Sequence, residues 1–472
     1  MNPAATFPIP AIMPAPLREP FVHKRLVFQS LLCSWPSMAL LGMGRPAQAS
    51  MWVVGCVLLM MLWHLNQKNR LALFTVLVGC VPALIILRGQ VFPYNTPMAL
   101  YGLAMLFAIT DKTLFSRIWN TELTRYFVLF VTVYWLICAM YNLDYSSNLK
   151  SMDLVLSSMS LFLLSTRRSY LQTAMLGIAL TEIALGLGML PQSQRLGMIE
   201  VTGEETGGST HIGNPILVGL PSAMMILWGI CGKGQWLGLR GNPILRYTIM
   251  VAGGALLFLS TSRGAMFAGL AALTIVFFLD RGSRKDFAMA FILGFVLLSY
   301  GVTTEKGEYA LRYITKLTDE NKTLAQRTTG RLEQWVAIPA VFVDSPIWGH
   351  GPGQGRQISQ KYCGRLLAWH NLYLHFIAET GLLGLVPVLV FLGAVFRKTV
   401  SYWRVHGDPM PLAAIMGFLV TGMSVNCLDM TCGLWLGVAM TAIKPVGYFV
   451  PRVYEVREQP PVAPRSLEEA EA

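Results

Sequence analysis

The stretch YLHFIAETGLLGLVPVLVFLGAVF, residues 373–396, decides the fold class because it is long and apolar enough to cross a lipid bilayer as one helix. Glu379 is its only acidic residue, and it contains no lysine or arginine. Similar segments recur along the chain, and 54% of the 472 residues are hydrophobic against 13% charged. A soluble core needs far less apolar surface. The sequence therefore predicts a polytopic membrane protein.

Fourteen segments have roughly the length and hydrophobicity of a membrane span, and they predict an all-α bundle of about 12 (12–14) transmembrane helices. Some are short or contain proline, so two of them can be halves of one broken helix. The candidate segments are 26–43, 48–66, 71–88, 95–110, 124–142, 151–166, 171–190, 214–231, 246–262, 264–280, 287–302, 373–396, 410–428 and 431–450.

Basic residues alternate between loops, and the positive-inside rule converts that alternation into an orientation of the spans. Pairs or clusters of lysine and arginine recur in alternate loops, which we predict to be cytoplasmic. The intervening short loops carry about one basic residue each and are predicted to face the periplasm; these residues are Arg45, Arg88, Lys150, Arg195 and Arg263. By the same alternation the long segment 303–370 is also predicted to be periplasmic. Its many charges do not contradict the rule, because long loops translocate regardless of charge.

The alternation divides the chain into two tails, two sets of helices and a cap. The predicted parts are a cytoplasmic tail at 1–25, a transmembrane helical bundle at 26–302, a periplasmic cap at 303–370, C-terminal transmembrane helices at 371–450 and a cytoplasmic tail at 451–472. Within the cap, RLEQWVAIPAVFV at 331–343 predicts a helix whose apolar face suits a membrane surface. The segment GHGPGQG at 349–355 predicts irregular backbone.

Composition and motifs exclude several kinds of partner and catalytic site. The net charge of +12 does not indicate nucleic acid as a partner, because the basic residues fall mainly in short loops between apolar segments. None of the eight cysteines forms a CxxC pair, and the sequence has no P-loop, HExxH, GxSxG or Asp-x-Asp motif. We therefore predict no metal site and no cofactor. A transferase without paired carboxylates for a cation must neutralise a phosphate leaving group with arginines.

Four arginines on the predicted periplasmic side are candidates for that task. Arg263 lies in STSRGAMFAG, where hydroxyls and a bare backbone suit an anion, although a lone interfacial arginine often only contacts lipid headgroups. Arg195 lies in a polar, glycine-containing loop at 191–213, and a solvated loop charge is the alternative. Arg327 and Arg331 in RTTGR are four residues apart, so they form either a pyrophosphate clamp or an ordinary charged turn.

The segment WHNLYLHFIAETGLLG at 369–384 carries the sharpest local signal. His370 is predicted in the first turn of a helix at the periplasmic interface, where the helix N-terminus keeps the imidazole neutral and able to accept a proton. The alternative is an interfacial histidine that only bonds backbone or headgroups. His375 and Glu379 follow four residues apart on one face, and a carboxylate inside a span implies a partner such as an arginine or a histidine. Glu182, in another span, predicts a structural contact between helices.

The order of these elements resembles the O-antigen ligase and polymerase superfamily. The resemblance is carried by TSRG at 261–264, RTTGRLEQW at 327–335 followed by GHGPGQG, and HNLYLHFIAETGLLG at 370–384. The segment GGSTHIGNPILVG at 207–219 is also similar to a glycine–asparagine stretch of that family. By motif the resemblance covers about 190–385, and the remainder is similar only in hydropathy.

The resemblance implies a glycosyltransferase-C-like architecture in the bacterial inner membrane, acting at the periplasmic face on undecaprenyl-diphosphate-linked glycans. It implies that His370 is the catalytic base, that Arg263 binds phosphate, and that Arg195, Arg327 and Arg331 are donor contacts, with His375 and Glu379 in support. Transfer would be inverting and independent of metal.

Three acceptors are open within the superfamily. The ligase transfers O-antigen to lipid A-core, the polymerase extends carrier-linked O-antigen, and protein O-oligosaccharyltransferases modify serine. We favour the ligase because the cap is compact and has no appended soluble acceptor domain. A non-enzymatic alternative is a lipid-linked-glycan transporter, in which Glu182, Glu379 and His375 would be substrate or proton sites.

Overall fold

The computed structural model describes residues 22–87, 96–112, 146–190, 199–203, 208–212, 214–231, 242–315, 331–425 and 430–443, with isolated positions between 115 and 137. Its helices are α1 (Lys24–Gly42), α2 (Pro46–Asn66), α3 (Arg70–Gly79), α4 (Val81–Ile86), α5 (Thr96–Ile109), α8 (Ser146–Leu164), α9 (Arg168–Met189), α10 (Pro215–Ile230), α11 (Pro243–Ser260), α12 (Arg263–Leu279), α13 (Arg284–Val302), α14 (Glu305–Ile314), α16 (Arg331–Asp344), α17 (Gly355–Cys363), α18 (Leu372–His406), α19 (Met410–Gly422) and α20 (Met430–Met440). Two strands, β1 (Ile199–Gly203) and β2 (Gly208–Ile212), complete it.

The structure is predominantly helical, as the hydropathy pattern predicts. Four helices are long and apolar enough to cross a bilayer: α2, α9, α11 and α18. The pair α12 and α13 passes the same test as a unit although it bends by 112°, which gives up to five candidate spans among the described residues. Further apolar helices of 10–17 residues are shorter than a full span. The chain is thus a multi-pass membrane protein, and the larger predicted number of spans stays a prediction.

Asparagine and proline together set where several helices begin. The Asn214 side chain accepts a hydrogen bond from the backbone N–H of Ile216, and Asn242 accepts one from Leu245. In both helices the next residue is proline, whose missing N–H costs nothing at the first helical position. These local signals therefore fix the starts of α10 and α11.

Small residues let the helices of the bundle approach closely. A Cβ atom placed on Gly177 of α9 would lie 2.9 Å from the Cα atom of Gly79 in α3, so neither position accepts a larger residue without movement. The carboxyl group of Glu182 in α9 is fully buried and accepts a hydrogen bond of 3.1 Å from Ser222 of α10. This confirms the prediction that Glu182 contacts another helix.

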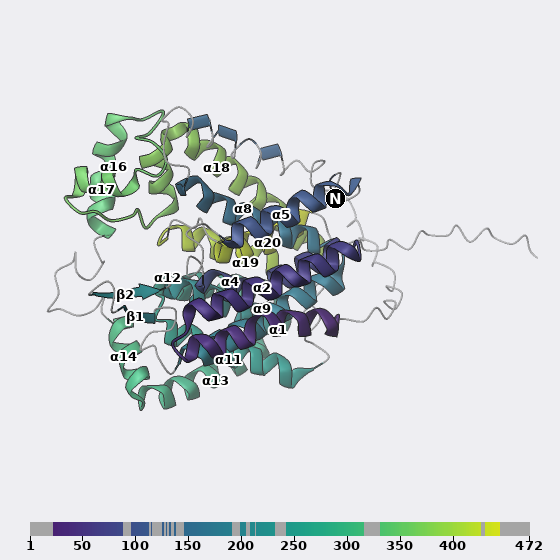
Figure 1. Ribbon diagram of the computed structural model, residues 1–472. Coiled ribbons are helices and arrows are strands. Elements are labelled where there is room, and N and C mark those ends of the chain that lie inside the picture. The colour runs from purple at the N-terminus through teal and green to yellow at the C-terminus, as the bar shows by residue number, and fades with distance from the viewer. Residues whose placement is uncertain are drawn as a thin grey trace, which may run out of the picture.

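The elements outside the bundle collect at one end of it (Figure 1). The helices α14, α16 and α17 and the hairpin of β1 and β2 all lie at the left of the view. The hairpin pairs Ile199 with Ile212 and Gly203 with Gly208, and the sequence pattern had not predicted it. The helix predicted at 331–343 is confirmed as α16. The predicted tails at 1–25 and 451–472 lie almost entirely outside the described residues.

Candidate functional site

A break in α18 organises the site. Gly381 has φ 57° and ψ −155°, a conformation that is essentially restricted to glycine, and the helix is interrupted there. The interruption leaves backbone groups that segment 346–351 satisfies. The N–H groups of His350 and Gly351 donate to the carbonyls of Ala378 and Glu379 at 2.9 Å each. In return, the N–H groups of Leu382 and Leu383 donate to the carbonyls of 346 and 347.

Glu379 holds the glycine-rich segment 349–355 in place through hydrogen bonds. Its carboxylate accepts hydrogen bonds from the backbone N–H groups of Gly353 at 2.7 Å and Gly355 at 3.0 Å. Gly355 is the first residue of α17, so the carboxylate also sits at a helix N-terminus, where negative charge is favoured. The segment GHGPGQG is irregular, as predicted, and Gly349, Gly351 and Gly353 have positive φ. Its amides at 353 and 355 are occupied by Glu379, so they do not form a cradle for phosphate.

His375 accompanies Glu379 one turn earlier in α18. Its Nδ1 atom lies 3.4 Å from Glu379 Oε1, and both side chains are buried. Of the two partners that the sequence left open for Glu379, the structure therefore provides the histidine. This arrangement gives both residues a structural role in joining the cap to the helix.

The Gly381 break makes a specific prediction about stability. Replacing Gly381 by alanine should lower the free energy of unfolding by about 1–3 kcal/mol, because alanine is strained in this backbone conformation. Its Cβ atom would also lie 2.5 Å from the carbonyl oxygen of Ile347. The unfolding midpoint of the purified protein measures the effect. Gly393→Ala in the same helix is the control, since a Cβ atom there meets nothing within 4 Å; equal midpoints for the two variants would contradict the prediction.

His370 lies just before α18 rather than in its first turn, which corrects the prediction. The N-cap is Asn371, whose Oδ1 atom accepts from the N–H groups of Tyr373 at 2.9 Å and Leu374 at 3.0 Å. The backbone N–H of His370 donates to Gln334 Oε1 at 3.5 Å, and the amide nitrogen of Gln334 donates to the carbonyl of Ala368 at 2.9 Å. Gln334, buried in α16, thus holds the loop that carries His370.

The imidazole of His370 has a lowered pKa, as a base that works near neutral pH requires. Burial lowers the pKa of His370 below its ordinary value of 6.5, and the positive charge of Arg331 lowers it further. The predicted tendency of the imidazole to stay neutral agrees with this direction of the pKa shift. The cause differs, because the effect comes from burial and Arg331 rather than from the end of α18.

Arg263 begins α12 at a tight turn after α11. Only Thr261 and Ser262 separate the two helices, and Thr261 is buried with φ 53°. A β-branched residue in this left-handed conformation is a genuine outlier, and such strain is often kept where function needs it. The α10 helix packs against this turn through Gly219, where an added Cβ atom would lie 3.0 Å from both Ser260 Oγ and Ser262 Cβ. Gly219, the last residue of the motif segment 207–219, therefore neighbours the turn of the TSRG motif.

The turn bearing Arg263 and the loop bearing His370 meet at the end of α19. A Cβ atom on Gly264 would lie 2.5 Å from Ser424 Oγ. On the other side, the side-chain amide of Asn371 donates to the carbonyl of Met423 at 3.1 Å. Residues 423 and 424 thus contact the direct neighbours of Arg263 and of His370. The positive charge of Arg331, the first residue of α16, also acts on the imidazole of His370.

Two of the predicted site residues, Arg195 and Arg327, lie outside the described residues. The sequence reasoning missed two positioning residues. Asn371 was open to prediction, because asparagine before an apolar helix is a typical N-cap. Gln334 was not, since a glutamine in an amphipathic helix carries no signal of its partner.

The match to a known family falls on this region. Residues 248–389, less than a third of the chain, match the family model described as O-antigen ligase. The match supports an assignment to the O-antigen ligase family. The matched residues run from α11 into α18 and include Arg263, Arg331 and His370. The family implies glycosyl transfer of the O-antigen ligase and polymerase type, with lipid-linked glycans as substrates. No curated protein matches the chain.

Proposed function

We propose that this O-antigen ligase family member transfers O-antigen from undecaprenyl diphosphate to lipid A-core, at the periplasmic face of the inner membrane. The observation that carries the proposal is that the start of α12 approaches Ser424 through Gly264, while the N-cap of α18, Asn371, bonds the adjacent Met423. A cationic group and a neutral imidazole therefore border one region. That combination suits a donor with an anionic leaving group and an acceptor with a hydroxyl.

The chemistry is a single displacement at the anomeric carbon of the donor. His370 takes the proton of the acceptor hydroxyl as that oxygen attacks, and the bond from the anomeric carbon to the diphosphate oxygen breaks. The electron pair leaves with undecaprenyl diphosphate, whose charge Arg263 and Arg331 stabilise. Arg195 and Arg327 remain candidates for the same role. Attack opposite the leaving group inverts the anomeric carbon. A diphosphate stabilised by guanidinium groups needs no metal, so we expect activity to survive chelation.

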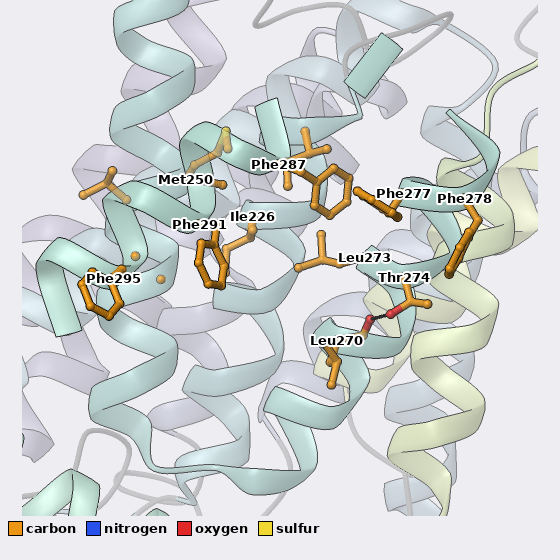
Figure 2. Close-up of a pocket in the computed structure, with 15 residues that line it drawn as sticks. Ile226, Met250, Leu270, Leu273, Thr274, Phe277, Phe278, Phe287, Phe291 and Phe295 are labelled. Atoms are coloured by element: carbon orange, nitrogen blue, oxygen red, sulfur yellow. Dashed lines mark hydrogen bonds between the residues drawn. The ribbon is translucent and has the colours of Figure 1, made fainter. Parts of the chain in front are cut away.

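An apolar cavity beside α12 supports a donor with a long hydrocarbon chain. The cavity has a volume of about 610 Å³ and is lined by residues of α10, α11, α12 and α13, with Phe277, Phe287 and Phe291 among them (Figure 2). Thr274 is its one polar lining side chain, and it donates to the carbonyl of Leu270 at 2.8 Å. Leu270 lies about 10 Å along the axis of α12 from Arg263. The α12 helix therefore carries the cationic Arg263 at its N-terminus and lines the apolar cavity from Leu270 onward.

The deciding experiment identifies the acceptor. Purified protein in lipid nanodiscs is incubated with undecaprenyl-diphosphate-linked O-antigen and, separately, with lipid A-core, carrier-linked glycan or protein, and the masses of the products are measured. We expect lipid A-core to gain the glycan. A mass gain only on carrier-linked glycan would identify a polymerase, and a gain only on protein would identify a protein O-oligosaccharyltransferase. Translocation of the donor without a new glycosidic bond would favour the transporter.

Arg263→Lys should reduce the transfer rate by about tenfold or more, because lysine keeps the charge but loses a second hydrogen bond to the diphosphate. The rate at saturating acceptor, measured against donor concentration, checks this. Arg284→Lys, at the first residue of α13, is the control. An Arg263→Lys variant as active as wild type would favour a simple contact with lipid headgroups.

The pH profile of kcat/KM tests the base. As pH falls through the pKa of His370 the imidazole gains a proton and stops accepting one, so activity is lost on the acid side. Because that pKa is lowered, the loss should come below pH 6.5. Arg331→Gln removes a positive charge, so it should raise the pKa and move the acid limb to higher pH. Arg365→Gln, which breaks a surface ion pair with Glu333, should leave the limb in place; an unmoved limb in Arg331→Gln would contradict this assignment.

A further inference from the structure

The cap carries a row of exposed apolar side chains that its own fold does not use. We name it the cap stripe; its members are Leu332, Trp335, Val336, Val343, Ile347 and Trp348. Val336 is 74% and Val343 76% exposed, values far above those of core residues. On a helix of 3.6 residues per turn, the four members in α16 fall within about 100° of one another. Contiguous apolar surface of this kind marks an interaction site.

The opposite face of α16 is committed to the cap. Val341 is fully buried and clusters with Ile358 of α17 and Trp369. Gln334, on the same side, holds the loop that carries His370. The α16 helix therefore has apolar side chains on two opposite faces, and the rest of the cap covers only one of them. Glu333 and Asp344 mark one border of the exposed face.

The cap stripe continues into the exposed face of a candidate span. The carbonyl of Ile347 accepts from the N–H of Leu383, which joins the end of the stripe directly to α18. From that point Leu382, Val386 and Leu389 are exposed at 42%, 50% and 45% along one face of α18. Because α18 is long and apolar enough to span a bilayer, that face is where lipid chains lie. The stripe begins where this lipid-facing surface ends.

Aromatic residues and charge indicate that a lipid leaflet covers the cap stripe. Trp335 and Trp348 are the residue type enriched where a membrane meets water. Segment 331–365 carries four basic residues against two acidic ones, and Arg356, Lys361 and Arg365 are exposed on or just after α17. A basic, tryptophan-bearing surface suits the anionic headgroup region of a lipid leaflet.

We propose that the cap stripe is inserted into the headgroup and acyl boundary of the lipid leaflet next to the cap, so that α16 lies on the membrane surface. The inference requires that α18 spans the membrane and does not depend on glycosyl transfer. It has a consequence for the site, because α16 grips the loop of His370 through Gln334. The depth of the stripe then sets the height of His370 above the lipid.

Quenching by brominated lipid tests this insertion. Cysteine replaces Val336 or Val343 in a chain carrying Cys363→Ser, and the new thiol is labelled with an environment-sensitive fluorophore. The proteins are reconstituted into vesicles of phosphatidylcholine and phosphatidylglycerol, with or without bromine on the upper acyl chain. Gln357→Cys, exposed on α17, is the matched control, and the Cys363→Ser parent reports background labelling.

We expect brominated lipid to remove most of the fluorescence at 336 and 343 and little at 357. Equal, weak quenching at all three sites would overturn the proposal. So would disulfide cross-linking of Val343→Cys between copies, which would show a second chain covering the stripe, or quenching that appears only when brominated lipid A-core is supplied. Each labelled chain is compared with its own sample lacking bromine, and a variant that folds poorly is recognised by a lowered unfolding midpoint before quenching is read.

Discussion

Replacing His370 by alanine is expected to lower the rate of glycosyl transfer by about 10²–10⁴, the usual loss when a general base is removed. Gln334 and the Asn371 cap of α18 hold the backbone around His370, and the lowered pKa of its imidazole keeps it able to accept a proton near neutral pH. The measurement is transfer from undecaprenyl-diphosphate-linked glycan to lipid A-core by purified protein. The unfolding midpoint should stay close to that of wild type, since alanine keeps the backbone N–H of His370 that donates to Gln334.

His406→Ala provides the matched control, because His406 is exposed at the opposite end of α18. It should leave the transfer rate unchanged. Transfer by His370→Ala at nearly the wild-type rate would remove His370 from the mechanism, and the shared region of His370 and Arg263 would then need another role.

Glu379→Ala is expected to be among the most destabilising substitutions in the cap. It leaves the half-buried N–H of Gly353 and the buried N–H of Gly355 without their acceptor, at a cost of about 1–3 kcal/mol for the buried one and less for the other. Glu379→Gln keeps one oxygen and should fall between alanine and wild type. The unfolding midpoint measures stability, and we expect the transfer rate to fall with it, because the fastened segment connects α16 and α17 to α18.

Asp344→Asn separates this effect from a general loss of negative charge in the cap. Asp344 is exposed and pairs with Lys361 at 3.3 Å, and exposed pairs contribute little to stability. Its midpoint should therefore change little. If Glu379→Ala and Asp344→Asn had the same midpoint, the carboxylate of Glu379 would not be holding the cap.

Local sequence patterns were sufficient for several elements. The apolar run at 373–396 lies within α18, the amphipathic pattern at 331–343 became α16, and the glycines of 349–355 became irregular backbone. Each of these depends on residues within a few positions of one another. The number of spans stays a prediction, since several apolar segments form helices of 10–17 residues, shorter than a full span.

The sequence did not indicate how Glu379 would be used. A carboxylate in an apolar helix predicts a partner, but the partners found are backbone amides 24 and 26 residues earlier. The break at Gly381 was equally hidden. Glycine is common in membrane helices, and only the docking of 346–351 against the broken turn makes this one necessary.

By itself, the sequence determined that the chain is predominantly helical with several long apolar helices, and it selected Arg263 and His370 as the residues to consider, because hydropathy and local motifs depend on consecutive residues. Only the tertiary structure decided that the turn at Arg263 and the loop at His370 meet at residues 423 and 424. These contacts join segments that lie about 50 to 160 residues apart in the chain. They form only when the helices pack, so no pattern of consecutive residues predicts them.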